Sequence, residues 1–305
     1  MNYRNIIKSR ELRVTILTFL GWIPDGIMLR LQYWLQTGRK LNLKNPKHFT
    51  EKLQLYKLKY RNPDMLRCTD KYEVRGYIEE KGLGEYLIPL IGVYNTVDEI
   101  DYAKLPQQFV AKSTDGGGGN QVLVCKDRDS LKEEEFKKSL NAWMEARKVK
   151  VHAGREWAYE NDYPRRIIIE KLIGDSNDDL KDYKFFCFNG KVGVVYGISD
   201  RKVGQSAQLG IYDRNFNKLD VDRCDERHQD IPLAKPKNYE KMVQIAEQLS
   251  EDFPHVRVDL YNVAGKIYFG ELTFYDGSGY MKFNPDSFDE ELGDMFDVSV
   301  FYNYK

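Results

Sequence analysis

VRVDLYNVAGKIYFGELTF, residues 256–274, predicts a β-hairpin that carries an arginine and two carboxylates. Apolar and polar residues alternate in its first half, so successive side chains point to opposite faces. One face carries Val256, Val258 and Leu260, and the other carries Arg257, Asp259 and Tyr261. A three-residue loop, 263–265, is expected, because its final glycine can adopt positive φ.

This loop sets the expected register. It places Arg257 opposite Glu271 and Asp259 opposite Phe269, so Asp259 and Glu271 become diagonal neighbours on one face. Their backbones would then lie roughly 7–8 Å apart, close enough for the two carboxylates to share a cation. A salt-bridged solvent face is an equally good interpretation of an isolated hairpin. A two-residue loop would move Glu271 to the other face.

The composition describes a globular protein without a charge bias. The 305 residues include 47 Lys and Arg and 47 Asp and Glu, so net charge gives no reason to expect a nucleic-acid partner. Four cysteines lie far apart without zinc-type spacing, as expected of reduced packing residues in a cytoplasmic protein: Cys68, Cys125, Cys187 and Cys224.

Residues 12–35 are the most apolar run near the N-terminus. Arg13, Asp25 and Arg30 interrupt this run, so a transmembrane helix is not expected. Its aromatic residues and nearby cations leave a contact with a membrane or a partner open. We expect instead a buried amphipathic helix, because the spacing is helical. The residues concerned are Trp22, Tyr33, Trp34, Arg30, Arg39 and Lys40.

Mixed helices and strands without regular βαβ repetition predict an α+β fold. The expected helices are 25–36, 51–60 (preceded by Thr50), 71–81 (capped by Thr69 or Asp70), 130–148 and 238–250. Besides the hairpin, the expected strands are 86–94, 109–112, 121–124, 166–173, 183–188, 191–198 and 208–212.

A glycine-rich segment follows the strand that ends at Lys112. Residues 113–120, STDGGGGN, contain four consecutive glycines, whose N–H groups can converge on an anion. Lys112 would add a positive charge to such a site. The segment is not a Walker A loop, because GxxxxGK[ST] is absent and a strand follows it. A flexible hairpin tip is the alternative.

A buried strand with a polar end follows at residues 166–174, RIIIEKLIG. The end of this strand could present backbone groups to an adenine edge. Most strands of this kind are simply part of a core, so the segment alone says little.

Taken in order, these segments resemble the ATP-grasp superfamily from about Asp70 to Gly279. The stretches LNLKNPKHFTEKLQLYKLKYRNP (41–63), DKYEVRGYI (70–78) and YLIPLIGVY (86–94) look more specifically like its TupA-like branch. That branch is associated with bacterial cell-surface polysaccharide synthesis. The resemblance implies two α+β lobes that grip a nucleotide, preceded by a mainly helical segment. The implied divisions are 1–60 for this segment, 61–108 for an α/β subdomain, 109–170 for the small lobe and 171–305 for the large lobe.

The resemblance also implies ATP and Mg²⁺ as cofactors and assigns residues to them. Lys71 and Lys112 would hold the phosphates, and the loop formed by Asp115, Gly116, Gly117, Gly118, Gly119 and Asn120 would close over them. The adenine would lie beside Glu170, Lys171, Leu172 and Ile173. Asp179 or, preferably, Asp182 would bind the ribose, while Lys184 and, more weakly, Arg201 are candidates for phosphate contacts.

The metal ligands implied by the resemblance are Asp259, Glu271 and Thr273. Family members usually have Asn where Thr273 stands, which puts the second metal position in doubt. Arg257 would stabilise negative charge on an acyl phosphate or a tetrahedral intermediate. The turn 277–279 matches the substrate-side loop of the family, and a plain turn is the alternative.

These parts imply an ATP-dependent carboxylate–amine ligase that works through an acyl phosphate. The branch suggests the carboxylate of a uronic acid on a bacterial surface polysaccharide, and an amino acid or another amine, as its substrates. A sugar kinase, a glycosyltransferase-like enzyme, and a nucleotide-binding scaffold of a polysaccharide assembly complex are the alternatives. We expect a cytoplasmic protein with no nucleic-acid partner and with possible peripheral contact with membrane-linked polysaccharide machinery.

Overall fold

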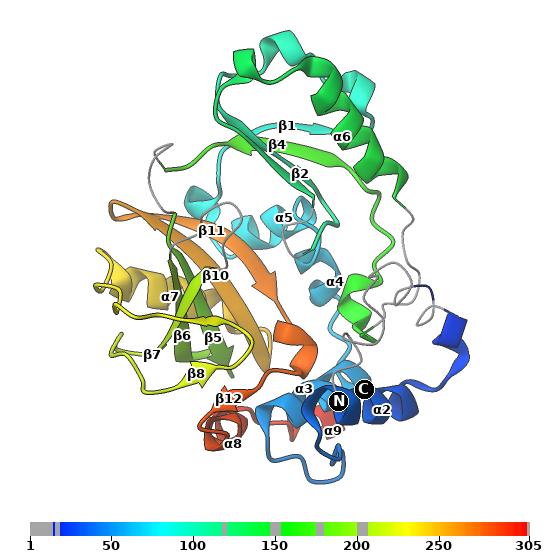
Figure 1. Cartoon of the computed structure of the whole chain (residues 1–305), viewed down its shortest axis with the longest axis vertical. Coiled ribbons are helices and arrows are strands. Elements are labelled where there is room, and N and C mark those ends of the chain that lie inside the picture. Colours follow the sequence, from blue (N-terminus) through cyan, green and yellow to red (C-terminus); the bar gives the residue numbers. More distant parts are fainter. Residues whose placement is uncertain are drawn as a thin grey trace.

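The structure is a computed structural model that describes residues 15, 19–117, 121–146, 154–174, 180–199 and 207–303. Two sheets dominate it, with helices α4 (Asp64–Cys68) and α5 (Glu73–Glu80) between them (Figure 1). The predicted α+β class is confirmed. Among the described residues, no helix is both long enough and apolar enough to cross a bilayer.

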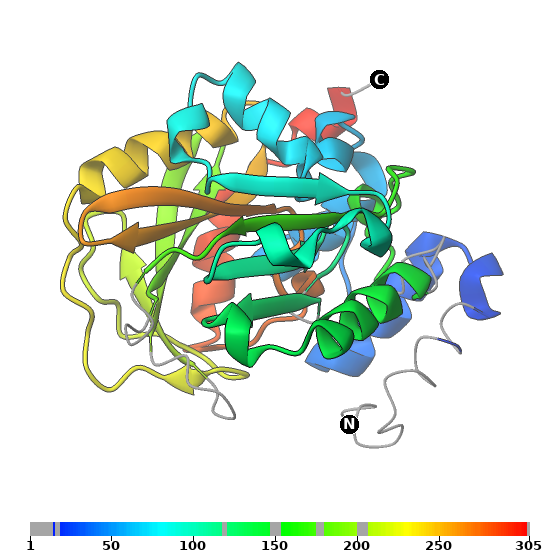
Figure 2. The ribbon, with the colours of Figure 1, turned by 90° about the horizontal axis from the view of Figure 1, so that it is seen from above.

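The smaller sheet has four antiparallel strands in the order β1-β4-β2-β3, which lie side by side in Figure 2. The strands are β1 (Leu90–Tyr94), β2 (Phe109–Ser113), β3 (Val122–Cys125) and β4 (Ile167–Lys171). Helix α6 (Glu133–Glu145) packs on this sheet. The rings of Phe109 and Phe136 meet edge to face at 5.6 Å, and Ile167 and Ile169 complete the same core.

The larger sheet has six strands in the order β11-β10-β5-β6-β7-β9, and only the β7–β9 pair is parallel. The strands are β5 (Asp182–Phe188), β6 (Lys191–Ser199), β7 (Gln208–Asp213), β9 (Arg227–His228), β10 (His255–Val263) and β11 (Lys266–Thr273). Helix α7 (Tyr239–Ser250) covers one face, where Cys187 Sγ reaches the carbonyl oxygen of Ala246 and Phe185 contacts Tyr239.

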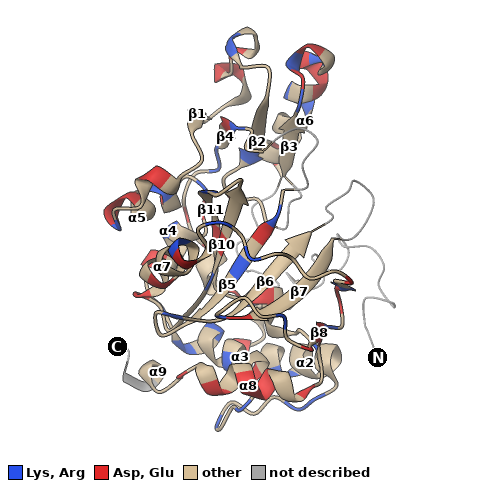
Figure 3. Ribbon diagram, turned by 90° about the vertical axis from the view of Figure 1, so that its left-hand side faces the viewer, with Lys and Arg blue, Asp and Glu red and all other residues tan. Residues whose placement is uncertain are grey.

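The opposite face of β5 and β10 changes character along the strands. At one end Phe186, Phe188 and His255 pack against Phe49 of helix α3 (Phe49–Lys59). Further along, the same face carries charged residues, which lie in the middle of the molecule (Figure 3). Because side chains alternate along a strand, one sheet face provides both a core surface and a polar site.

Several short elements complete the lower part of Figure 1: α2 (Asp25–Thr37), α8 (Ser287–Met295), α9 (Val300–Asn303) and a two-stranded sheet of β8 (Asp222–Arg223) and β12 (Phe283–Asn284). Helix α8 is bound to α3 through Asp289, which accepts hydrogen bonds from Thr50 N (3.0 Å) and Oγ1 (2.7 Å). The 3₁₀ turns include η2 (Leu20–Trp22), η3 (Gly84–Tyr86), η7 (Trp157–Tyr159) and η8 (Asp276–Gly279).

Most of the predicted elements are present, but their ends differ. The strand predicted from residue 86 begins only at Leu90, because a 3₁₀ turn occupies 84–86 and Pro89 has no N–H to donate. The predicted helix 71–81 begins at Glu73. Asp70 caps it as expected, since its Oδ1 accepts from the N–H groups of Tyr72 (2.9 Å) and Glu73 (3.0 Å).

The predicted register of the β10–β11 hairpin is wrong, although Asp259 and Glu271 still lie on one face. Its loop has two residues, Ala264 (φ 52°) and Gly265 (φ 97°), both in the left-handed region that a type I′ turn requires. Gly270 then forms a bulge, so Asp259 pairs directly with Glu271 and Arg257 pairs with Thr273. A two-residue loop alone would place Glu271 on the face opposite to Asp259. The bulge at Gly270 shifts the strand by one residue and so returns Glu271 to the face of Asp259.

The expectation of a buried helix near the N-terminus is only half right. Helix α2 buries Met28, Leu29 and Tyr33 against the body of the protein. Trp22 and Trp34 remain exposed, by 76% and 54% respectively. The helix therefore has apolar side chains on two sides, of which one faces solvent.

Candidate active site

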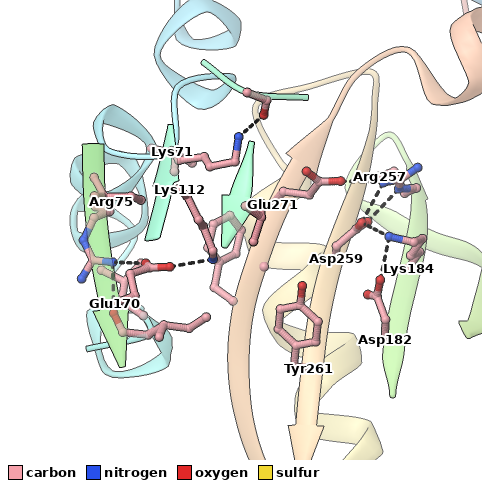
Figure 4. Close-up of a pocket in the computed structure, with 18 of the residues that line it drawn as sticks. Lys71, Arg75, Lys112, Glu170, Asp182, Lys184, Arg257, Asp259, Tyr261 and Glu271 are labelled. Atoms are coloured by element: carbon pink, nitrogen blue, oxygen red, sulfur yellow. Dashed lines mark hydrogen bonds and ion pairs between the residues drawn. The ribbon is translucent and has the colours of Figure 1, made fainter. Parts of the chain in front are cut away.

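A cavity of about 690 Å³ lies between the two sheets (Figure 4). Lys71 and Arg75 reach it from the start of α5, and Lys112 and Glu170 reach it from the four-stranded sheet. The six-stranded sheet contributes a polar set to the opposite wall: Asp182, Lys184, Arg257, Asp259, Tyr261 and Glu271. The volume is in the usual range for a small-molecule site.

A second cavity of about 370 Å³ shares part of this lining. Lys71, Gly116, Arg257 and Glu271 line both cavities, so the two spaces meet at two cations and a carboxylate. The rest of the second cavity includes Thr273, Tyr159 and Tyr275 together with residues 276–278 of η8.

Glu170 organises the wall formed by the four-stranded sheet. Its Oε2 lies 2.6 Å from Lys112 Nζ, and its Oε1 lies 3.2 Å from Arg75 Nη1. Lys112 and Glu170 are diagonal neighbours across β2 and β4, because Val110 pairs with Glu170 and Lys112 pairs with Ile168. Two cations are therefore held side by side over the cavity.

Lys71 connects α5 to the glycine-rich segment. Its N–H donates to the carbonyl oxygen of Thr114 (2.9 Å), and its Nζ donates to the carbonyl oxygen of Gly116. Burial lowers the pKa of Lys71, and the positive charge of Lys112 acts in the same direction, whereas Glu271 opposes the change. A cation in such surroundings gains when an anion enters the cavity.

Asp115 supports the loop from behind. Both of its carboxylate oxygens accept from Arg165 Nε, at 2.9 and 2.8 Å, and Ser113 Oγ donates to Oδ1 at 2.7 Å. It is absent from the lining of both cavities, whereas Gly116 lines both and Gly117 lines the second. The other loop residues predicted to close over phosphates, Gly118, Gly119 and Asn120, lie outside the described residues, as do Asp179 and Arg201.

The segment predicted to lie beside adenine is only partly in the wall. Glu170 lines the larger cavity, but Lys171, Leu172 and Ile173 do not. The side chain of Lys171 is exposed, and its N–H donates to the carbonyl oxygen of Pro89 at 2.9 Å. The role of these three residues stays a prediction.

The six-stranded sheet carries a connected network of charges. Arg257 forms a bidentate pair with Asp259, with Nε–Oδ1 and Nη2–Oδ2 both at 2.7 Å. Its Nη2 also lies 2.9 Å from Glu271 Oε1, and its Nη1 contacts Asp276. Lys184, which pairs with Asp259 across β5 and β10, contacts that carboxylate and lies 2.9 Å from Asp182.

The two carboxylates on the hairpin differ in their electrostatics. Burial raises the pKa of Asp259, although Arg257 and Lys184 oppose the change. Burial would also raise the pKa of Glu271, but Arg257, Lys184 and Lys71 lower it below its usual range. The Glu271 side chain keeps 51% of its exposure, whereas Asp259 keeps 3%. Glu271 is therefore the ionised oxygen donor that faces open space.

Asp259, Glu271 and Thr273 fit the requirements of Mg²⁺. All three offer hard oxygen ligands, and Thr273 Oγ1 already lies 3.2 Å from Glu271 Oε1. Within the described part of the chain, no group of three or more His, Cys, Asp or Glu residues forms a metal cluster. Mg²⁺ commonly uses one or two carboxylates together with substrate phosphates, so two carboxylates are sufficient.

Three charged residues of the site were not predicted from the sequence. Arg75 lies four residues after Lys71, and within the helix predicted over 71–81 this spacing would place both on one face, so the sequence could have revealed it. Arg223 Nη1 lies 3.0 Å from Asp276 Oδ2, although the two residues are 53 positions apart in the sequence. No local sequence pattern signals such a contact. Asp276 joins Arg223 to Arg257 and so extends the network into η8.

With this geometry established, the comparison with known families is decisive. A family model described as TupA-like ATPgrasp matches residues 51–297. The chain belongs to the TupA-like ATP-grasp family. ATP-grasp ligases use ATP and Mg²⁺, the cofactors that the sequence predicted.

Comparison with solved structures finds ATP-grasp ligases at low identity. The D-alanine–D-alanine ligase from Helicobacter pylori is 16% identical, with 76% of this chain and 64% of that chain covered and a TM-score of 0.43. The Bacillus anthracis D-alanine–D-alanine ligase complexed with ATP is 15% identical, with coverages of 77% and 68% and a TM-score of 0.44.

The L-amino acid ligase from Bacillus licheniformis is 13% identical, with coverages of 72% and 44% and a TM-score of 0.41. This TupA-like ATP-grasp chain thus spans less than two thirds of the Helicobacter pylori and Bacillus licheniformis chains. None of the curated proteins matches it. At these identities we transfer no residue roles from these structures.

Proposed function

We propose that this TupA-like ATP-grasp protein is an ATP-dependent carboxylate–amine ligase that acts through an acyl phosphate. The supporting observation is that Lys71, Arg257 and Glu271 line both cavities. A nucleotide in the larger cavity and a carboxylate in the smaller one would meet at this shared wall. That is where phosphoryl transfer needs positive charge.

In this proposal the larger cavity binds the nucleotide from its two sides. Lys71 and Lys112 bind phosphate oxygens, and the backbone at 116–117 approaches them closely. Asp182 binds the ribose, and the end of β4 at 170–173 lies beside the adenine. Glu170 keeps Lys112 in place, since the two are paired at 2.6 Å in the protein alone.

The catalytic steps require charge compensation and no side-chain nucleophile. Asp259, Glu271 and Thr273 would hold Mg²⁺, which when bound would neutralise charge on the transferred phosphoryl group. Lys184 keeps Asp259 oriented and adds positive charge to the same side. Arg257 reaches the smaller cavity and stabilises the oxyanion that forms when an amine attacks the acyl group.

The family branch suggests the substrates. We propose that the carboxylate belongs to a uronic acid of a bacterial surface polysaccharide and that the amine belongs to an amino acid. The smaller cavity has tyrosines, Tyr159 and Tyr275, beside its charged wall, which suits a ligand with both a ring face and an acid. Whether the product contains a C–N bond is part of the proposal.

ADP release with Mg·ATP, measured across uronic acids and glycan fragments with and without amino acids, tests this function. We expect ADP only when a carboxylate and an amine are both present. Hydroxylamine should replace the amine and give a hydroxamate, because it captures an acyl phosphate. ADP formed with a sugar that lacks a carboxylate would instead identify a kinase. ATP binding without ADP formation in any mixture would support the alternative that the protein is a nucleotide-binding scaffold.

A further inference from the structure

Helix α2 and the turn before it expose five large apolar side chains. We call this set the α2 apolar face; it consists of Phe19 (80% exposed), Trp22 (76%), Ile27 (61%), Leu31 (47%) and Trp34 (54%). Residues 27, 31 and 34 follow the i, i+4, i+7 spacing of one helix side. The helix already packs on the protein through Met28, Leu29 and Tyr33, so this face is an additional one.

Polar contacts hold the α2 apolar face in a fixed position. Arg155, itself only 7% exposed, donates to the carbonyl oxygens of Leu20 (2.9 Å) and Gly21 (3.2 Å) and pairs with Asp25 at 3.1 Å. Further along α2, the hydroxyl of Tyr33 lies 2.9 Å from Thr50 Oγ1. A large apolar surface that is held rigidly in water calls for something to cover it.

The same end of the chain carries a strong positive charge. Residues 1–47 contain nine Lys and Arg but only two acidic residues, a net charge of +7 in a chain whose total is zero. Arg30 is exposed on α2, and Lys40, Lys44 and Lys47 are exposed in the loop that follows it. The remainder of the protein is correspondingly acidic, and the exposed cations Arg30, Lys40, Lys44 and Lys47 lie on α2 or directly after it.

We propose that the α2 apolar face docks on the surface of an anionic lipid membrane. Tryptophans and aliphatic residues on one helix side, flanked by cations, are the features of helices that lie in the membrane interface. The cations add attraction to anionic headgroups. A second copy of the chain is a poorer occupant, because two such ends would repel each other. This inference does not depend on the proposed ligase activity.

A short chain of contacts links η2 to the wall of the smaller cavity. Gly154 precedes the Arg155 that holds η2, and its carbonyl oxygen accepts from Lys57 Nζ at 3.0 Å. The same Nζ donates at 2.8 Å to the carbonyl oxygen of Ser278, in the wall of the smaller cavity.

Sedimentation of the full-length protein with vesicles tests the proposal. We expect binding to mixed phosphatidylcholine–phosphatidylglycerol vesicles and weaker binding to phosphatidylcholine alone. The triple substitution Trp22→Ser, Ile27→Ser and Trp34→Ser should weaken partitioning at least about tenfold. Arg30→Gln with Lys40→Gln should weaken binding to the mixed vesicles only. Ile231→Ser is the matched control, because Ile231 is 80% exposed but lies outside the face.

Three outcomes would overturn the proposal. They are absence of wild-type binding to either vesicle, equal binding by the triple variant, and a wild-type oligomer that the triple substitution converts to a monomer without lipid. The last outcome would make the face an interface between copies. Unchanged thermal unfolding of each variant, measured without vesicles, shows that any loss of binding is not a loss of folding.

Discussion

Asp259 and Glu271 lie directly opposite each other on the hairpin, yet their side chains have different surroundings. Asp259 is buried between Arg257 and Lys184, and its negative charge is needed to balance both. Glu271 faces the cavities, where its Oε1 lies 2.9 Å from Arg257 Nη2 and 3.2 Å from Thr273 Oγ1. Asp259 therefore combines a structural role with its proposed role as a ligand, whereas Glu271 is the cleaner test of metal binding.

We predict that Glu271→Gln abolishes Mg²⁺-dependent ADP formation and leaves the free energy of unfolding within about 0.5 kcal/mol of the wild type. The substitution removes a charged ligand from a half-exposed position. Asp259→Asn should also abolish turnover but should cost about 3–5 kcal/mol of stability, because it breaks a buried ion pair. Urea unfolding and an ADP assay measure both effects. Wild-type turnover in Glu271→Gln would remove Glu271 from the metal site.

Lys112 offers a second prediction at the residue scale. Lys112→Ala should weaken ATP binding by about 1.5–3 kcal/mol, the range for a charged hydrogen bond, and so raise Kd at least about tenfold. Lys171→Ala is the control, because Lys171 lies on the adjacent strand β4 with an exposed side chain outside the cavity lining. Equal affinity of the Lys112 variant and the wild type in a calorimetric titration would contradict the assignment.

His255 predicts a pH dependence of stability. Its ring lies among Phe49, Phe188 and Phe296, with centroid distances of 4.9–5.2 Å, and its Nδ1 lies 2.9 Å from the carbonyl oxygen of Cys187. Burial lowers the pKa of His255 from 6.5 to about 3. The unfolded chain therefore binds a proton that the folded protein does not, and stability is lost as the pH falls below about 6.5.

Between about pH 7.5 and pH 5, His255 should lower the free energy of unfolding by about 2 kcal/mol. His255→Leu should reduce the loss by that amount, although it also removes the hydrogen bond to Cys187. Urea unfolding at both pH values measures the difference. An unchanged slope for His255→Leu would show that the ring is not buried in the neutral form.

At the scale of elements, the β10–β11 hairpin shows what the sequence could and could not predict. Its alternation predicted both faces, because burial imposes a period of two on any half-buried strand. Its register was not predictable, because a loop of two residues and a bulge at Gly270 compensate each other. A Cβ at position 270 would lie 2.9 Å from the carbonyl oxygen of Asp259, so the bulge depends on a close approach that only the folded hairpin reveals.

Helix α3 and turn η8 form a second unit that the sequence did not reveal. Gly277, Ser278 and Gly279 all have positive φ, at 49°, 54° and 67°, which is unfavourable for a serine. Gln54 Nε2 donates to the carbonyl oxygens of Ser278 (3.1 Å) and Gly279 (2.9 Å), and Lys57 Nζ reinforces the first contact. The helix therefore maintains the wall of the smaller cavity.

We predict that Lys57→Met reduces ADP formation by raising the apparent KM for the acceptor, with nucleotide affinity changed less than about twofold. Lys57 is fully buried, and its loss releases the carbonyl oxygens of Gly154 and Ser278. Lys52→Met is the matched control on the same helix. Lys52 also binds two carbonyl oxygens, of Gly293 (2.7 Å) and Phe296 (2.8 Å), but neither of these residues lines a cavity, whereas Ser278 lines the smaller one. An equal loss of nucleotide affinity and of acceptor affinity in Lys57→Met would contradict the assignment of Lys57 to the acceptor cavity.

At the scale of the whole molecule, the mixture of helices and strands was sufficient to predict the α+β class, and the resemblance to the ATP-grasp superfamily added the expectation of two lobes. The cavity itself could not be predicted, because its walls come from strands and helices that are distant in sequence, as the contact of Arg223 with Asp276 illustrates. The exposed side of α2 was missed for a related reason. Helical periodicity shows that a residue lies on an apolar side but not whether a partner covers that side.

The central claim is that the cavity between the two sheets binds Mg·ATP through Lys71, Lys112 and the hairpin carboxylates. Calorimetric titration of the full-length protein with a non-hydrolysable ATP analogue, in Mg²⁺ and in EDTA, tests it most directly. We predict one binding site per chain, weaker binding in EDTA, and at least about a hundredfold loss of affinity in Lys71→Ala with Lys112→Ala. Binding of the double variant with wild-type affinity, or no binding by the wild type, would contradict the account.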